Sequence, residues 1–289
     1  MRSNPLSPWA TVPLAVGAFL LLTWLECRRP LRRHVESKTR RGVRNVALGG
    51  VNAVVIQLAE MPLVLGLCRI VEERRWGLLQ AVDLPPWVGI PAAVILTDYT
   101  IYLWHILLHR VPLLWRFHMA HHADLDMDAS TALRFHFGEE VFSVPWRAAQ
   151  AVLIGLTPLT FSIWQMVFLL SILFHHSEVK LPIAWERRVN WLVVTPRMHG
   201  IHHSIVREEA ESNWSSGLSL WDRMHRTLRL NLPQDEISIG VPALRSPDVV
   251  TLPKIVKLPF DPPRAVWQFP GGGRPERQPA AGDPTCLHA

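Results

Sequence analysis

Two long apolar runs near the start of the chain limit the folds that are open to it. Residues 8–25 (PWATVPLAVGAFLLLTWL) and 45–70 (NVALGGVNAVVIQLAEMPLVLGLCRI) are predominantly apolar. A helix needs about 20 consecutive apolar residues to cross the hydrocarbon core of a bilayer. Because backbone polar groups find no partner in lipid, such segments have to be helical. The sequence therefore predicts an all-α, integral membrane protein.

The segment between these runs, residues 26–44, indicates how the chain is oriented. It contains eight Lys and Arg against two Glu. Loops rich in Lys and Arg stay on the cytoplasmic side of a membrane. Segment 71–86 then lies on the other side, and a third, less apolar run at 87–108 returns to the cytoplasm. A basic cluster can also be a nucleic-acid arm, but between two spans it is typical of an orientation signal. We expect no nucleic-acid partner.

A fourth apolar stretch, residues 148–174, is interrupted near its middle by Gly-Leu-Thr-Pro. Each half is short for a span, so we expect a helical hairpin that enters and leaves one leaflet. Such a hairpin returns His175 and His176 to the cytoplasmic side. The sequence thus predicts about four membrane-embedded helical segments, the last a broken hairpin, with a cytoplasmic helical cap rich in histidine. Arginine outnumbers lysine by 26 to four, which favours a GC-rich bacterial genome and hence a bacterial inner membrane.

The composition changes after residue 230. Eleven of the 24 prolines lie in residues 231–289. Segment 231–265 keeps enough apolar residues to pack on the rest of the protein, whereas 266–289 has the composition of a disordered tail. We expect an N-terminal membrane region at 1–86, a histidine-rich domain at 87–230, a packed extension at 231–265 and a disordered tail at 266–289.

Histidines gather at three places that this topology brings to the same side of the membrane. Their spacings are HxxxH at 105–109 and HxxHH at both 118–122 and 199–203. Helical residues three or four apart share a face, so each group can direct its imidazoles toward one point. The adjacent pair in HxxHH diverges enough to serve two metal ions, and imidazole suits Fe, Zn, Cu and Ni. These eight core histidines are His105, His109, His118, His121, His122, His199, His202 and His203.

Other polar residues bear on this predicted metal site. Asp98 lies inside the third run, where a carboxylate is costly and usually functional. It could orient one of the ligands through the free nitrogen of the ring. The three cysteines are far apart in the sequence, which argues against an iron–sulfur cluster or a Cys-ligated zinc. The isolated His34, His225 and His288 are interpreted as ordinary surface or core residues.

Several segments between about residues 97 and 230 resemble those of the fatty acid hydroxylase/sterol desaturase superfamily, whose members are membrane non-haem di-iron enzymes. They are DYTIYLWHILLHR, LWRFHMAHH, RFHFGEE, FHHSEVKLP, TPRMHGIHHS and NWSSGLSLWDRMHRT. The resemblance implies that residues 87–230 form the catalytic domain and that the eight core histidines bind two iron ions. It adds His136 from the RFH segment and His176, with the adjacent His175 able to replace it.

The resemblance also implies the chemistry. No side chain acting as acid or base can break an unactivated C–H bond, so iron and O2 have to supply the oxidant. We expect hydroxylation of a fatty acyl, sterol or isoprenoid lipid, with desaturation at the same centre still open. The sequence lacks a haem motif of the HPGG type and a GxGxxG fingerprint, which implies an external ferredoxin or cytochrome-type donor with its reductase.

Two further functions fit the sequence less well. A membrane zinc hydrolase needs three protein ligands and a catalytic carboxylate, and this chain offers far more histidines than that. A metal transporter or store would carry charged residues through its spans, and apart from Glu60 and Asp98 the spans lack them. The oligomeric state stays open.

Overall fold

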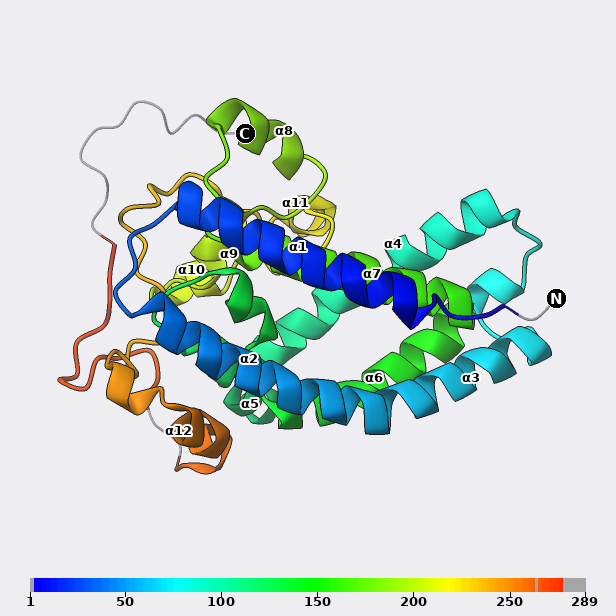
Figure 1. Ribbon diagram of the computed structural model, residues 1–289, viewed down its shortest axis with the longest axis horizontal. Helices are drawn as coiled ribbons and strands as arrows, with labels where there is room; N and C mark the ends of the chain where they lie inside the picture. The colour runs from blue at the N-terminus through cyan, green and yellow to red at the C-terminus, as the bar shows by residue number, and fades with distance from the viewer. Residues whose placement is uncertain (1–2, 263–264, 278–289) are drawn as a thin grey trace.

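The computed structural model describes residues 3–262 and 265–277. All its regular elements are helices, and within these ranges the β-structure is limited to isolated bridges. Figure 1 shows long helices that run side by side, with short helices gathered at one end of them. The prediction of an all-α fold is confirmed.

Four helical segments are long and apolar enough to cross a membrane. They are α1 (Pro8–Arg28), the continuous segment Lys38–Gln80, α4 (Pro86–Arg110) and α7 (Pro158–His176). The second consists of α2 (Lys38–Val55), the π-helical turn η1 (Ile56–Glu60), α3 (Met61–Arg74) and the short 3-10 turn η2 (Leu78–Gln80). On α1, Trp9 is 90% exposed and Leu20 60% exposed, as expected of a surface that lipid covers.

The predicted hairpin is present, but it extends further than one leaflet. Its first arm is α6 (Phe137–Gln150) with the π-helical turn η4 (Ala151–Gly155), and its second arm is α7. The tip packs on the turn between α3 and α4: a Cβ at Gly77 would collide with the backbone nitrogen of Gly155. Both glycines have φ of +87°, a conformation that other residues rarely adopt. The hairpin therefore reaches the far end of the spans, and the single-leaflet prediction is wrong.

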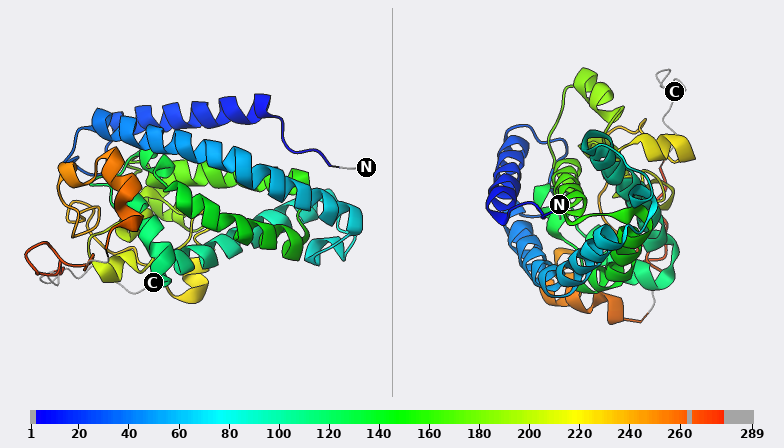
Figure 2. Two further views of the ribbon diagram at one scale, coloured as in Figure 1. Left: turned by 90° about the horizontal axis from the view of Figure 1, so that it is seen from below. Right: turned by 90° about the vertical axis from the view of Figure 1, so that its right-hand side faces the viewer.

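The short helices form a cap at the opposite end of the spans, as two further views show (Figure 2). They are α5 (Pro112–His122), η3 (Ala129–Leu133), α8 (Ile183–Asn190), α9 (Pro196–His202), α10 (Arg207–Ala210), α11 (Leu220–His225), η5 (Pro247–Val249), α12 (Leu252–Lys257) and η6 (Leu258–Phe260). The last residues of α4 and α7 lead into this cap (Figure 1). The histidines at those helix ends are thus brought to one end of the molecule, as predicted.

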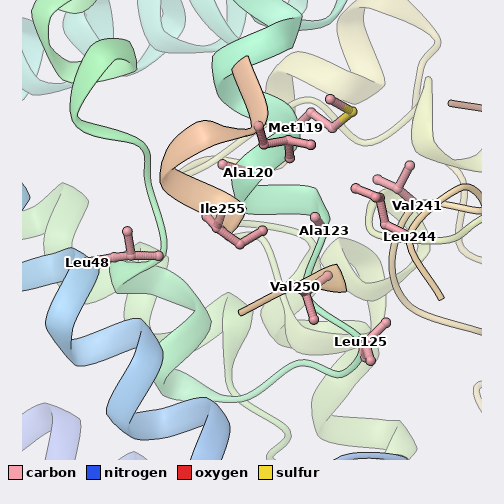
Figure 3. Close-up of a cluster of buried hydrophobic side chains, with 10 residues drawn as sticks. Leu48, Met119, Ala120, Ala123, Leu125, Val241, Leu244, Val250 and Ile255 are labelled. Atoms are coloured by element: carbon pink, nitrogen blue, oxygen red, sulfur yellow. The ribbon is translucent and has the colours of Figure 1, made fainter. Parts of the chain in front are cut away.

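A hydrophobic core joins the cap to the second span. It contains Leu48 of α2, Met119 and Ala120 of α5, and Ile255 of α12, all 5% exposed or less. Figure 3 shows these side chains together with Val241 and Val250 from the extension after residue 230. The extension therefore covers α5, the helix that carries His118, His121 and His122.

Part of the predicted tail is ordered. The Trp267 ring stacks on Trp115 at 5.6 Å between centroids, and the Arg277 guanidinium bonds to Glu209 at 2.6 and 3.0 Å. The prediction of disorder is wrong for residues 266–277, because single aromatic and arginine contacts outweigh a composition rich in Pro and Gly. The rest of the predicted tail, 278–289, lies outside the described residues.

Candidate metal centre

Nine histidines meet where the spans join the cap. The last turns of α4 contribute His105 and His109, the last turns of α5 contribute His118, His121 and His122, α7 contributes His176, and α9 with its C-cap contributes His199, His202 and His203. Within each helix the spacing of three and four residues puts the rings on one face, as the sequence predicted. Their convergence from four helices depends on the tertiary fold.

The nine imidazole rings form two groups. In each group, every histidine offers one possible ligand nitrogen, and these nitrogens all lie within 4.8 Å of one another. The five-histidine group is His105, His109, His118, His122 and His202. The four-histidine group is His121, His176, His199 and His203. Both HxxHH motifs divide their adjacent pair between the groups. The arrangement thus offers two neighbouring sites, each with its own set of ligands.

Hydrogen bonds fix the tautomers of the five-histidine group. His105 donates from Nδ1 to the carbonyl of Trp214 at 2.7 Å, and His202 donates from Nδ1 to the carbonyl of Ser212 at 2.8 Å. A carbonyl oxygen can only accept, so both Nδ1 atoms carry the proton and both Nε2 atoms keep a free lone pair. The Nδ1 of His118 lies 3.0 Å from the Glu139 carboxylate, an orienting contact that is common behind metal ligands.

Five ring nitrogens of this group have no hydrogen-bond partner among the described residues. They are Nε2 of His109, His118 and His202 and both ring nitrogens of His122, all buried. A buried polar atom without a partner costs about 1–3 kcal/mol. Several such atoms at one point would be strongly unfavourable unless something binds them. Converging lone pairs of neutral imidazoles fit a metal ion such as iron, zinc or copper.

The four-histidine group converges still more closely. The Nε2 atom of His176 lies 3.0 Å from that of His121 and 3.0 Å from that of His199, which lies 3.1 Å from that of His203. His176 donates from Nδ1 to the carbonyl of Ile172 at 2.8 Å, so its Nε2 atom keeps a lone pair. Two nitrogen ligands at right angles around a metal, with bonds of about 2.1 Å, are about 3.0 Å apart. This geometry also fits a metal ion.

Burial keeps these imidazoles neutral. It lowers the pKa of His118 to about 3. Burial, with a smaller contribution from neighbouring rings, holds the pKa well below the ordinary value at His121, His122, His199, His202 and His203. Neutral imidazole is the form that binds a metal, so the cap provides ligands that do not have to lose a proton at neutral pH.

Two of the predicted ligands lie outside both groups. His136 is the N-cap of α6: its Nδ1 accepts from the backbone of Gly138 at 3.0 Å, and its Nε2 donates to the carbonyl of Val256 at 3.0 Å. Both nitrogens are used within the fold and His136 belongs to neither group, so its role as a ligand stays a prediction that this arrangement does not favour. His175 packs on His199 with 4.0 Å between ring centroids, but it belongs to neither group.

Asp98, which the sequence connected with a ligand histidine, has other hydrogen-bond partners in the structure. Its carboxylate accepts from the backbone of Leu218 at 2.9 Å and from Nε1 of Trp221 at 2.7 Å. Among the described residues the carboxylate that contacts a ligand histidine is instead Glu139, in the first turn of α6. The segment RFHFGEE contained this residue, and the acid three positions after His136 was the available signal. The carbonyls of Trp214 and Ser212 left no signal in the sequence.

Comparison with known proteins agrees with this geometry. Residues 90–227 match the family model "Fatty acid hydroxylase". Similar proteins include alkylglycerol monooxygenase of Xenopus tropicalis (28% identical over 53% of this chain and 33% of the relative) and ornithine lipid hydroxylase OlsE of Rhizobium tropici (28%, over 51% and 44%). Cholesterol 25-hydroxylase of Homo sapiens is 29% identical, over 47% of this chain and 49% of the relative.

The match thus spans between a third and a half of the length of these curated relatives. No solved structure matches the chain. The two histidine groups lie wholly within the matched residues. The described part of this chain is helical and has four segments long and apolar enough to cross a membrane, and its residues 90–227 match the fatty acid hydroxylase family.

Proposed function

We propose that this chain hydroxylates an unactivated C–H bond of a membrane lipid, using O2 at a di-iron centre formed by the nine histidines. The observation that carries the proposal is the pair of buried histidine groups, in which neutral nitrogens converge and five of those nitrogens lack a partner. The three relatives reported above are named for oxygenation of a lipid, which favours hydroxylation over desaturation.

The number of ligands favours iron over zinc. Catalytic zinc takes three protein ligands and keeps one position open, whereas these groups offer five and four histidines. When bound, two iron ions would supply the redox chemistry with O2 that no side chain provides. One oxygen atom enters the C–H bond, and the other leaves as water with two electrons and two protons. We propose that an external ferredoxin or cytochrome-type donor supplies the electrons.

The residues around the centre would orient the ligands and exclude water. Trp214, Ser212 and Ile172 hold the outer nitrogens of three histidines through backbone carbonyls. Eight of the nine histidines are buried and His109 is partly exposed. A dry, preorganised site keeps a reactive oxidant away from bulk solvent.

The proposed location follows from the basic segment 26–44. Arg32 in this segment bonds to Glu178, directly beyond α7, and to the carbonyl of Pro196 at the start of α9. The basic segment and the centre therefore lie at the same end of the spans. By the rule that positive loops stay inside, we place the centre on the cytoplasmic face, in a bacterial inner membrane.

The test compares the wild type with His202→Ala and with His34→Ala, a histidine outside the centre. Each is expressed in an iron-replete bacterial host under ¹⁸O2, and extracted lipids are compared by mass spectrometry. We expect a lipid with one labelled oxygen in the wild type and in His34→Ala, and none in His202→Ala. A product that lacks two hydrogens and carries no label would establish desaturation instead. Labelled product in His202→Ala would contradict the proposed centre.

A further inference from the structure

A cavity of about 300 Å³ lies between α4 and α7, on the span side of the histidine centre. One face of each helix lines it, at positions three or four residues apart. These positions are Ile90, Val94 and Asp98 on α4 and Trp164, Phe168 and Ser171 on α7. Since α4 rises 1.5 Å per residue, the lined stretch of that helix is about 12 Å long.

The cavity suits an apolar chain. Its lining is apolar apart from Asp98, Ser171 and the indole nitrogen of Trp164. Ile95 and Val167 also line it and are 41% and 43% exposed, so it opens sideways between two membrane-spanning helices. The surroundings of that opening in a bilayer are hydrocarbon. Pockets for small molecules begin at about this volume. A hydrocarbon chain is the ligand whose chemistry matches both the lining and the entrance.

The inner end of the cavity shares a wall with the histidine centre. Gly217 and Leu218 line the cavity, and the carbonyl of Trp214 in the same segment holds the Nδ1 of His105. His175, which packs on His199 of the centre with 4.0 Å between ring centroids, follows the cavity-lining Ser171 by one turn of α7. Segment 214–218 thus closes the cavity with Gly217 and Leu218, and it orients His105 of the centre through the carbonyl of Trp214.

Asp98 keeps this wall close to α4. It binds the backbone nitrogen of Leu218 and Nε1 of Trp221, both within 2.9 Å. A Cβ at Gly217 would collide with the Asp98 carboxylate, so only glycine permits this approach. The sequence connected this buried carboxylate with a ligand histidine. Its hydrogen bonds to Leu218 and Trp221 instead explain why a carboxylate lies inside a span: it fixes the segment that closes the cavity.

We propose that this cavity binds the hydrocarbon chain of the lipid substrate, which enters sideways between α4 and α7. The methyl end lies toward Ile90, deep in the span, because the histidine end of the molecule is where polar headgroups gather. Because segment 214–218 lies between the cavity and the histidines, the carbons offered to the centre are those outside the cavity, nearer the headgroup. The inference about which carbon is attacked rests on the proposed function. The inference that the cavity binds a hydrocarbon chain does not.

The test uses the purified full-length protein in phospholipid nanodiscs. The probe is hexadecylphosphocholine with a photoactivatable diazirine in the middle of its chain, and labelled peptides are mapped by mass spectrometry. We expect labels to concentrate on residues 90–98 and 164–171, and an excess of unlabelled hexadecylphosphocholine to remove them. Val94→Trp, which fills the cavity, should lower the labelling about tenfold. Val51→Trp, on the exposed face of α2, should leave it unchanged.

Two results would overturn the proposal. One is labelling of the wild type spread evenly over the exposed faces of α1 and α2. The other is labelling of Val94→Trp equal to that of the wild type. Labelling needs neither iron nor O2, so it tests chain binding separately from catalysis. If the protein forms the oxygenated lipid but the probe does not label residues 90–98 and 164–171, only the proposed chain-binding cavity is rejected. An intact pattern without any oxygenated product rejects the proposed function alone. A hydroxyl group found near the methyl end of the product would reject the orientation.

Discussion

The molecule buries polar groups in two regions that lie close together but differ in one respect. In the first, the guanidinium of Arg41 directs its nitrogens to Asp124 at 3.0 and 2.9 Å, to Asp128 at 2.8 Å and to Thr131 at 3.2 Å. In the histidine centre, by contrast, five buried nitrogens of one group have no partner among the described residues. Neither region is open to bulk water.

This difference distinguishes polar groups that stabilise the fold from polar groups that are suited to bind a ligand. A buried network of paired charges holds elements together, here α2 and the segment that leads from α5 to η3, although one nitrogen each of the adjacent Arg44 and Arg134 has no partner among the described residues. A buried group that lacks a protein partner needs an explanation, such as a bound ion or a catalytic role. Paired charges therefore identify the part of the cap that supports the fold. Converging neutral nitrogens identify the part that is suited to bind a metal ion.

The largest expected effect is on the free energy of unfolding, and it comes from the paired network around Arg41. Arg41→Met leaves the buried carboxylates of Asp124 and Asp128 without their shared cation, which costs about 3–5 kcal/mol. Chemical denaturation in detergent measures this loss in the free energy of unfolding. Arg75→Met removes an exposed partner of Asp83 and should cause no measurable change. Equal stability of the two variants would show that the buried network does not support the fold.

The next effect is on metal affinity. Glu139→Gln replaces the carboxyl group beside Nδ1 of His118 with an amide and should weaken iron binding about 10–100-fold. Competition with a chelator measures the affinity. Glu140→Gln makes the same chemical change one residue further on, where the nearest charges are Glu139, Glu60 and Arg147. If both variants weaken iron binding equally, the orienting role of Glu139 is wrong.

The smallest expected effect concerns His136 and His176, both of which the family resemblance implied to be ligands. His136→Ala removes the N-cap of α6 and should lower the free energy of unfolding by about 1 kcal/mol without loss of iron. His176→Ala should lose iron, because its Nε2 atom contacts two members of the four-histidine group. Elemental analysis of both purified variants provides the comparison. Loss of iron from His136→Ala would restore it as a ligand.

The sequence predicted the features that depend on local periodicity. The apolar runs gave the first three spans, and the Gly-Leu-Thr-Pro break gave the hairpin but not its length; its tip has Gly155 at positive φ and Thr157 as the cap of α7. The spacing within HxxxH and HxxHH placed the rings on shared helix faces. The division of His121 and His122 between two sites also follows from their divergence on a helix.

Features that depend on tertiary contacts could not be predicted. Whether His136 or His176 reaches a metal depends on which of their nitrogens the fold has already used. The carbonyl of Trp214 orients His105 across more than a hundred residues of chain, and a backbone group has no sequence signature. The same holds for Arg277, whose contact with Glu209 orders a segment that composition marks as disordered.

The most direct test of the account is the metal content of the purified wild-type protein after growth in iron-replete medium. Two histidine groups predict two iron ions per chain, and their addition to the metal-free protein should raise its melting temperature. A protein that contains no iron and gains no stability from Fe²⁺ would contradict the account, because the buried nitrogens would then lack the ligand that explains them.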